Sequence, residues 1–132
     1  MKVERLLGKG GKYGTLTVQS STYLFIMPTL KSNPILRNFQ KYVVELEQER
    51  GFSDNTPVEK CLLLGEEVGE LFKAVRKYGT ALRTDSASHV GTIEEELADI
   101  LIYVCAIANK YNIDLEQAFR EKEEINKKRV WK

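Results

Sequence analysis

Five acidic residues of this 132-residue chain have the types and the spacing of a metal-binding site. Three form a Glu-Glu-x-x-Glu pattern, and two form a Glu-x-x-Asp pattern further along the chain: Glu66, Glu67, Glu70, Glu96 and Asp99. Both patterns offer only carboxylate oxygens, without Cys or His. Such a donor set suits a hard cation, Mg²⁺ or Mn²⁺, better than zinc.

The second pattern lies at the start of a run that is apolar on nearly every side of a helix, from Leu97 to Ala108. A helix of that kind is normally buried, and an unpaired ionised carboxylate inside it is very costly. Glu96 and Asp99 are one helical turn apart, so both point to the same side. A positive charge should therefore meet them, and a metal ion is the simplest one.

The three acids of the first pattern share an arc of about 100° of their helix. Alone, they also fit an ordinary solvated face. If the two acidic helices pack antiparallel, four or five carboxylates converge, and their like charges destabilise the fold unless a cation neutralises them. The opposite side of the first acidic helix carries apolar residues that we expect to face a core: Cys61, Val68, Phe72 and Val75.

The last predicted helix adds basic and amide groups to an otherwise apolar stripe. That stripe begins with Leu115 and Phe119 and continues through Lys122, Asn126 and Arg129. Cations and an amide on such a face suit phosphate oxygens, although Lys122 and Arg129 also complement the dipole of their own helix. Beside a metal cluster, we interpret the three polar residues as phosphate-binding.

Four helices are predicted to position these groups in an all-α bundle. The first is capped by Ser32 or Asn33, with Pro34 in its first turn, and Gly51 ends it. The second runs from Pro57 to about Tyr78, and the third ends near Asn112. Capping boxes at Thr56, Thr92 and Asp114 open the second, third and fourth helices. Because most connections are short, consecutive helices should be antiparallel neighbours.

The chain divides into a domain at residues 29–132 and an extension at residues 1–28. The extension holds strand-type residues that predict a short hairpin turning near Ser20 and Ser21. The net charge of +1 gives no footprint for nucleic acid or an anionic membrane. No signal peptide or membrane span is recognised. Cys61 and Cys105 are predicted to be buried free thiols, which favours a cytoplasmic protein.

Residues 29–132 resemble the MazG-like all-α nucleoside triphosphate pyrophosphohydrolases, a superfamily that includes dimeric dUTPases and phosphoribosyl-ATP pyrophosphatases. The likeness rests on a first helix ending in ERGF and on the order of Glu-Glu-x-x-Glu, Glu-x-x-Asp and Lys-x-x-x-Asn. It implies cleavage of a nucleoside triphosphate between the α and β phosphates, giving a monophosphate and pyrophosphate. It also implies a requirement for Mg²⁺, with Mn²⁺ as a substitute, and a homodimer or homotetramer whose helices complete the bundle.

Carried over residue by residue, the resemblance gives each polar group a role. The metal ligands would be Glu67, Glu70, Glu96 and Asp99. Glu66 would orient or deprotonate the attacking water, and the phosphates would be held by Lys122, Asn126 and Arg129. The resulting hypothesis is an enzyme that clears unwanted nucleoside triphosphates. Two alternatives stay open: a phosphoribosyl-ATP pyrophosphatase, and a non-catalytic helical module that senses a nucleotide or cation.

Overall fold

The computed structural model describes residues 28–79, 81–83, 85 and 87–130. In this part the chain forms four helices and no strand: α1 (Leu36–Arg50), α2 (Pro57–Gly79), α3 (Ile93–Lys110) and α4 (Leu115–Asn126). The predicted all-α class and the order of the four helices are confirmed. The hairpin predicted around Ser20 and Ser21 lies outside the described residues.

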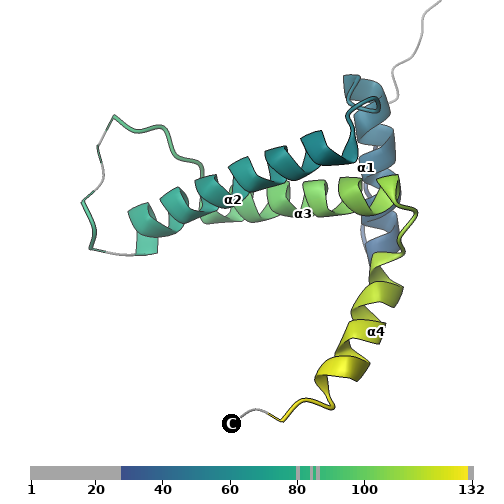
Figure 1. Ribbon diagram of the computed structural model, residues 1–132. Coiled ribbons are helices and arrows are strands. Elements are labelled where there is room, and N and C mark those ends of the chain that lie inside the picture. Colours follow the sequence, from purple (N-terminus) through teal and green to yellow (C-terminus); the bar gives the residue numbers. More distant parts are fainter. Residues whose placement is uncertain (1–27, 80, 84, 86, 131–132) are drawn as a thin grey trace, which may run out of the picture.

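The two helices that carry the acids, α2 and α3, form an antiparallel pair (Figure 1). At one end of the pair, α1 packs across α3, and α4 leads away from that end and touches α1. The prediction that all consecutive helices pack as antiparallel neighbours was therefore wrong. Only α2 and α3, among the described helices, are such a pair. A polar network explains the path of α4. The Gln40 side chain donates to Asn109 Oδ1 (3.2 Å) and to the Ile113 carbonyl (2.7 Å), and accepts from the Leu115 amide (3.1 Å), which fixes the start of α4 to α1.

Capping groups set the helix starts largely as predicted. The amides of Thr56 and Thr92 donate to the side chains of Glu59 (2.6 Å) and Glu95 (2.8 Å), and each threonine hydroxyl accepts in return. The Asp114 carboxylate accepts from two amides of α4. Gly51 ends α1 with φ +74°, in the left-handed region.

The first helix begins later than the sequence suggested. Its first residue is Leu36, and the cap position is Ile35, not Ser32 or Asn33. The Asn38 side chain accepts a hydrogen bond from the Ile35 amide at 3.1 Å. This bond satisfies a donor that has no partner within the helix, so the helix begins at Leu36, two residues after Pro34. At its other end α3 stops at Lys110, slightly short of the predicted Asn112.

The core of one chain is small and lies between α1 and α3. Val43, Cys105 and Ala106 are fully buried there, and four half-buried residues pack around them: Phe39, Tyr42, Ile102 and Leu115. The α2–α3 pair adds the buried Ala74 of α2, a small residue that allows the two helices to approach closely. None of the described helices is both long enough and apolar enough to cross a membrane.

One face of α2 that we expected to be buried is open in the single chain. Cys61 is exposed, and the Phe72 side chain is 70% exposed. The prediction of a buried Cys61 was therefore wrong for one chain, because α2 turns Lys60 and Ala74 inward instead. Leu97 of α3 is also 52% exposed, so α3 is not covered on all sides.

Candidate active site

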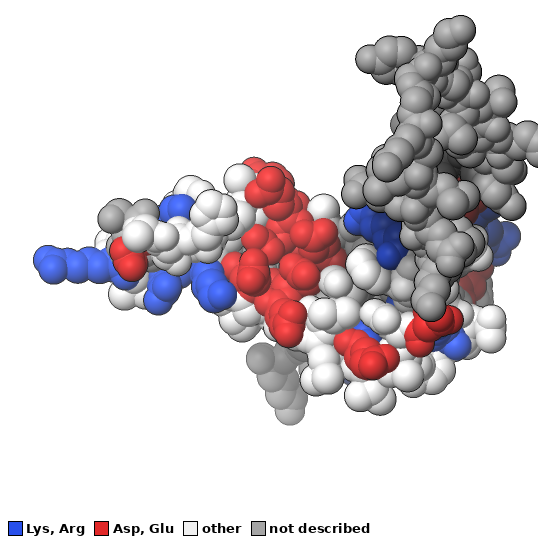
Figure 2. Space-filling model, turned by 90° about the horizontal axis from the view of Figure 1, so that it is seen from above, with Lys and Arg blue, Asp and Glu red and all other residues white. Residues whose placement is uncertain are grey.

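Three of the predicted acids meet between α2 and α3. One carboxylate oxygen from each of Glu67, Glu96 and Asp99 lies within 4.8 Å of the other two. Oxygens that bind the same Mg²⁺ at 2.0–2.1 Å are at most about 4.2 Å apart, so small side-chain adjustments would bring all three onto one ion. Figure 2 shows acidic side chains gathered over the middle of this helix pair. The donor set fits a hard divalent cation.

Glu96 is the buried member of the group, with 4% of its surface exposed. It lies in the first turn of α3, directly after the capped start at Thr92. Gly91 closes over its carboxylate, and a Cβ at this position would overlap Glu96 Oε1. The absence of a side chain at Gly91 therefore lets the loop cover the carboxylate while leaving it in place. The sequence did not distinguish Glu96 from Asp99, whereas the structure buries Glu96 more deeply.

The pKa values of two carboxyl groups in the cluster are raised, which indicates that a nearby positive charge would stabilise it. Burial raises the pKa of Glu67, and the nearby carboxylates of Asp99, Glu70 and Glu96 raise it further. Burial likewise raises the pKa of Glu96, with Glu70 and Asp99 adding to the effect. The cost of holding these charges together is what a bound cation would remove.

Glu66 and Glu70 lie beside the three-carboxylate group. Glu70 raises the pKa of both Glu67 and Glu96, so it faces the cluster, and its carboxylate lies 3.9 Å from Lys73 Nζ. Glu66 acts more weakly on Glu67. All five predicted acids therefore share one region, with three of them within direct reach of a common ion.

A pocket of about 440 Å³ opens beside the carboxylates and has Glu67 and Asp99 in its wall. Its other walls come from α1, the loop between α1 and α2, and α3. They include the aromatic residues Phe52 and Tyr103 and the polar residue Asn55. Charged residues line it as well: Glu47, Arg50 and Lys60. Burial raises the pKa of the Tyr103 phenol, and the charges of Glu67 and Asp99 raise it further. The volume lies in the range of small-ligand sites, and two aromatic residues beside polar groups are suited to a flat polar ring.

The model of the MazG nucleotide pyrophosphohydrolase domain matches residues 56–130. The chain belongs to this family. Among curated proteins it is similar to dCTP pyrophosphatase 1 of Bos taurus, with 31% identity over 124 residues that cover 91% of this chain and 70% of the relative. It is also similar to the uncharacterized protein YvdC of Bacillus subtilis, with 27% identity over 100 residues that cover 71% and 94% of the two chains.

Two solved structures share the fold of this MazG chain. The putative pyrophosphatase YPJD of Bacillus subtilis superposes with a TM-score of 0.60 at 25% identity, covering 76% of this chain and all of the other. The iMazG protein of Vibrio DAT 722 superposes with a TM-score of 0.51 at 34% identity, covering 71% and 99%. The MazG-like assignment from sequence is therefore confirmed, and the chain is a nucleotide pyrophosphohydrolase.

The predicted phosphate-binding residues of the MazG chain do not reach its acids. Lys122, Asn126 and Arg129 belong to the α4 region, which packs on α1 and projects away from the α2–α3 pair (Figure 1). Lys122 is exposed, and the Asn126 amide donates to Glu123 at 2.8 Å. Within one copy, the structure therefore keeps the two halves of the predicted site apart.

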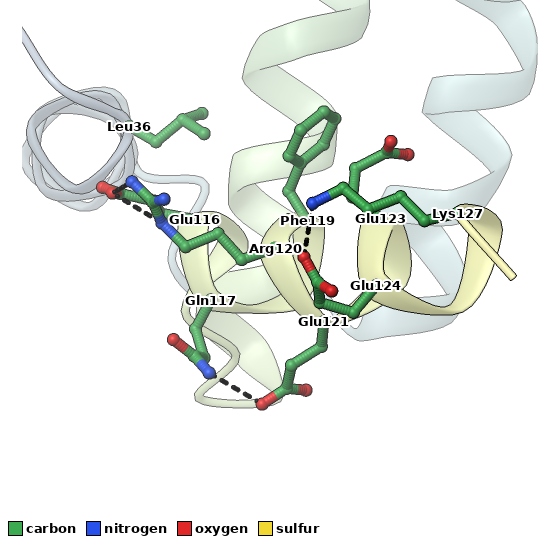
Figure 3. Close-up of a pocket in the computed structure, with 9 residues that line it drawn as sticks. All are labelled: Leu36, Glu116, Gln117, Phe119, Arg120, Glu121, Glu123, Glu124 and Lys127. Carbon is green, nitrogen blue, oxygen red and sulfur yellow. Dashed lines mark hydrogen bonds and ion pairs between the residues drawn. The ribbon is translucent and has the colours of Figure 1, made fainter.

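A second pocket, of about 580 Å³, follows α4 and is lined by Leu36, Phe119 and charged residues (Figure 3). Its polar side chains pair along the helix: Arg120 Nη2 lies 2.7 Å from Glu116 Oε1, and Gln117 Nε2 donates to Glu121 Oε1 at 2.8 Å. None of the five predicted acids lines it. It has the character of a charged helix surface.

Sequence reasoning missed the groups that build the first pocket. Asn55 and Tyr103 belong to none of the quoted motifs, and Phe52 entered only as the last residue of ERGF, with no role assigned. The wall that the three residues share depends on how α1 crosses the α2–α3 pair. Lys60 was missed as well, although it is 1% exposed and lies in the same wall. A usable signal was its place in α2, one turn before Leu63 and two turns before Glu67, on the same side of the helix.

Proposed function

We propose that the chain is a Mg²⁺-dependent nucleoside triphosphate pyrophosphohydrolase that releases a nucleoside monophosphate and pyrophosphate and clears unwanted nucleotides. The observation that carries the proposal is that the carboxylate group adjoins a pocket of the size of a small ligand. The oxygens of Glu67, Glu96 and Asp99, within 4.8 Å of one another, adjoin an aromatic pocket of about 440 Å³. The similarity to a dCTP pyrophosphatase supports a nucleoside triphosphate as substrate.

Each part of the site has a role in this reaction. Glu67, Glu96 and Asp99 would hold the metal, with Glu70 as a further ligand, and the rings of Phe52 and Tyr103 would take the base. Bound Mg²⁺ supplies polarisation of the phosphoryl oxygens and neutralises the departing pyrophosphate. Glu66 accepts the proton of the water that attacks phosphorus as the α–β phosphoanhydride bond breaks. Beyond this proton transfer, the protein has mainly to position the groups and balance their charge.

A homo-oligomer is part of the proposal, because one copy leaves both its apolar faces and its phosphate-binding residues unused. On α2 the exposed Leu62 and Phe72 flank Gly65 and Gly69, where a Cβ would meet nothing within 4 Å. Two copies that cover such faces can bring α4 of one copy to the acids of the other. Lys122, Asn126 and Arg129 would then hold the phosphates across the subunit boundary.

A mixing experiment tests the shared site. Glu67→Gln and Lys122→Ala are each expected to be inactive alone. In hetero-oligomers reassembled from the two variants, one site would carry both intact halves, and activity should reappear. If mass photometry shows a stable oligomer and the mixture stays inactive, the intersubunit arrangement is wrong.

The reaction itself is tested by pyrophosphate release from a panel of ribo-, deoxyribo- and modified nucleoside triphosphates, with phosphoribosyl-ATP included. Arms with Mg²⁺, Mn²⁺ and EDTA establish the metal requirement, and chromatography identifies the monophosphate. Metal-dependent release supports the proposal. A folded protein that binds nucleotide and forms no product would refute it.

A further inference from the structure

The loop between α1 and α2, residues 51–56, is held by two lysines that come from different helices. Lys60 Nζ of α2 donates to the Phe52 carbonyl at 3.3 Å, and Lys110 Nζ of α3 donates to the Ser53 carbonyl at 2.6 Å. Backbone bonds hold the loop as well: the Phe52 amide donates to the Glu47 carbonyl of α1 (2.8 Å), and within the loop the Asn55 amide donates to the Phe52 carbonyl (3.2 Å).

Lys60 is an unusual residue to find in this place. Its side chain is 1% exposed, and its ammonium pairs with the Glu47 carboxylate of α1, which is 14% exposed. Lysine is rarely buried so fully without a partner, and here the pair joins α1, α2 and the loop carbonyl at one point. The ammonium therefore fixes the position of the loop relative to the helix that carries Glu67.

The loop in turn forms the outer wall of the pocket beside the metal ligands. Phe52 and Asn55 are the loop residues that line this pocket, together with Tyr103 of α3. A peptide plane held at its carbonyl cannot rotate freely, so the two lysines restrict where the Phe52 ring and the Asn55 amide can sit. Displacement of such groups changes how well a flat ring is held, because a hydrogen bond weakens as its length and angle depart from the preferred values.

We propose that Lys60 and Lys110 are positioning residues that clamp residues 51–56 and thereby set which nucleoside the pocket accepts. This inference rests on the proposed function, since it concerns the substrate end that the metal site does not touch. Neither ammonium is asked to contact the substrate. The clamp acts on KM and on base preference, and the acids act on the chemical step.

Lys110→Met is the informative variant, because Lys110 is outside the pocket wall and its loss leaves the buried Lys60–Glu47 pair intact. Lys110→Arg keeps a donor for the Ser53 carbonyl. Lys41→Met is the matched control, since Lys41 is an exposed lysine of α1 with an exposed partner, Glu45, at 3.7 Å. Circular dichroism and thermal unfolding establish that all three are folded.

Two substrates separate selection from chemistry. With the preferred nucleoside triphosphate, Lys110→Met should raise KM about tenfold, the value of one hydrogen bond, and the ranking among bases should flatten. With methyl triphosphate, which has the α–β anhydride and no base, kcat/KM should match that of Lys41→Met. Lys110→Arg should restore the ranking. An unchanged KM and base ranking in Lys110→Met overturns the clamp.

Amide hydrogen exchange tests, independently of turnover, whether Lys110 restrains the loop. Exchange in residues 52–55 should be faster in Lys110→Met than in Lys41→Met, and unchanged exchange overturns the clamp. If the wild-type protein hydrolyses nothing in the panel, the proposed function fails. The exchange result still decides whether the loop is held by the lysine.

Discussion

The buried Lys60–Glu47 pair provides a quantitative test of how the helices are joined. Changing Lys60 to Met keeps a side chain of similar length and removes the ammonium. The Glu47 carboxylate, 14% exposed, is then left without its partner, and the Phe52 carbonyl loses a donor. Breaking a buried ion pair from one side typically costs about 3–5 kcal/mol. Because Glu47 retains some access to water, we expect the lower end, about 3 kcal/mol.

The double variant Lys60→Met/Glu47→Leu should recover most of that loss. Replacing both partners with apolar groups removes the unpaired charge, so its stability should lie within about 1 kcal/mol of the wild type. The assay is urea unfolding at pH 7, followed by circular dichroism at one fixed protein concentration. With an m-value of about 1.5 kcal/mol/M, the single variant lowers the midpoint by about 2 M. A single variant within about 0.5 kcal/mol of wild type would refute the burial argument.

Three further predictions concern the acidic cluster. Glu67→Gln and Asp99→Asn should each lower kcat/KM by at least about 100-fold, because a lost ligand removes several kcal/mol of transition-state stabilisation; circular dichroism should show unchanged helicity, and retained turnover would contradict the site. Gly91→Ala should displace the Glu96 carboxylate and weaken Mg²⁺ binding by about 10–100-fold in calorimetry, whereas Gly79→Ala, whose Cβ would make an ordinary contact with Val75, should bind normally. In EDTA, stability should fall as the pH rises from 4.5 towards the raised pKa values of Glu67 and Glu96, because the folded state holds more protons than the unfolded chain in that window. The measurement is thermal unfolding at a series of pH values. Saturating Mg²⁺ should abolish the fall in stability, and Glu67→Gln should reduce it. If the wild type and Glu67→Gln show the same pH dependence with and without Mg²⁺, the result argues against the cluster.

The sequence was sufficient to predict what depends on local spacing. The boxes at Thr56 and Thr92 located two helix starts, and the acidic patterns placed Glu67, Glu96 and Asp99 on facing helices. These predictions succeeded because helix periodicity fixes side-chain direction within a turn or two.

Features that depend on packing could not be read in the same way. The burial of Lys60 follows from where α1 crosses, and the pocket wall of Phe52 and Tyr103 joins residues far apart in sequence. The apolar face around Phe72 was recognised as a face for packing, yet periodicity does not say whether the same chain or another copy covers it. The separation of Lys122 from the acids has the same origin, since α4 is directed by the Gln40 network.

The location of the five acids within one helical hairpin has an evolutionary consequence. Every proposed metal ligand is supplied by α2 and α3, while the pocket wall that faces them comes largely from α1 and the six residues that follow it. Mutation can therefore alter the joint between α1 and α2 without touching a metal ligand. If the pocket selects the base as proposed, a lineage with this architecture can change its nucleotide specificity through mutations in a short surface loop, while the proposed metal ligands stay the same.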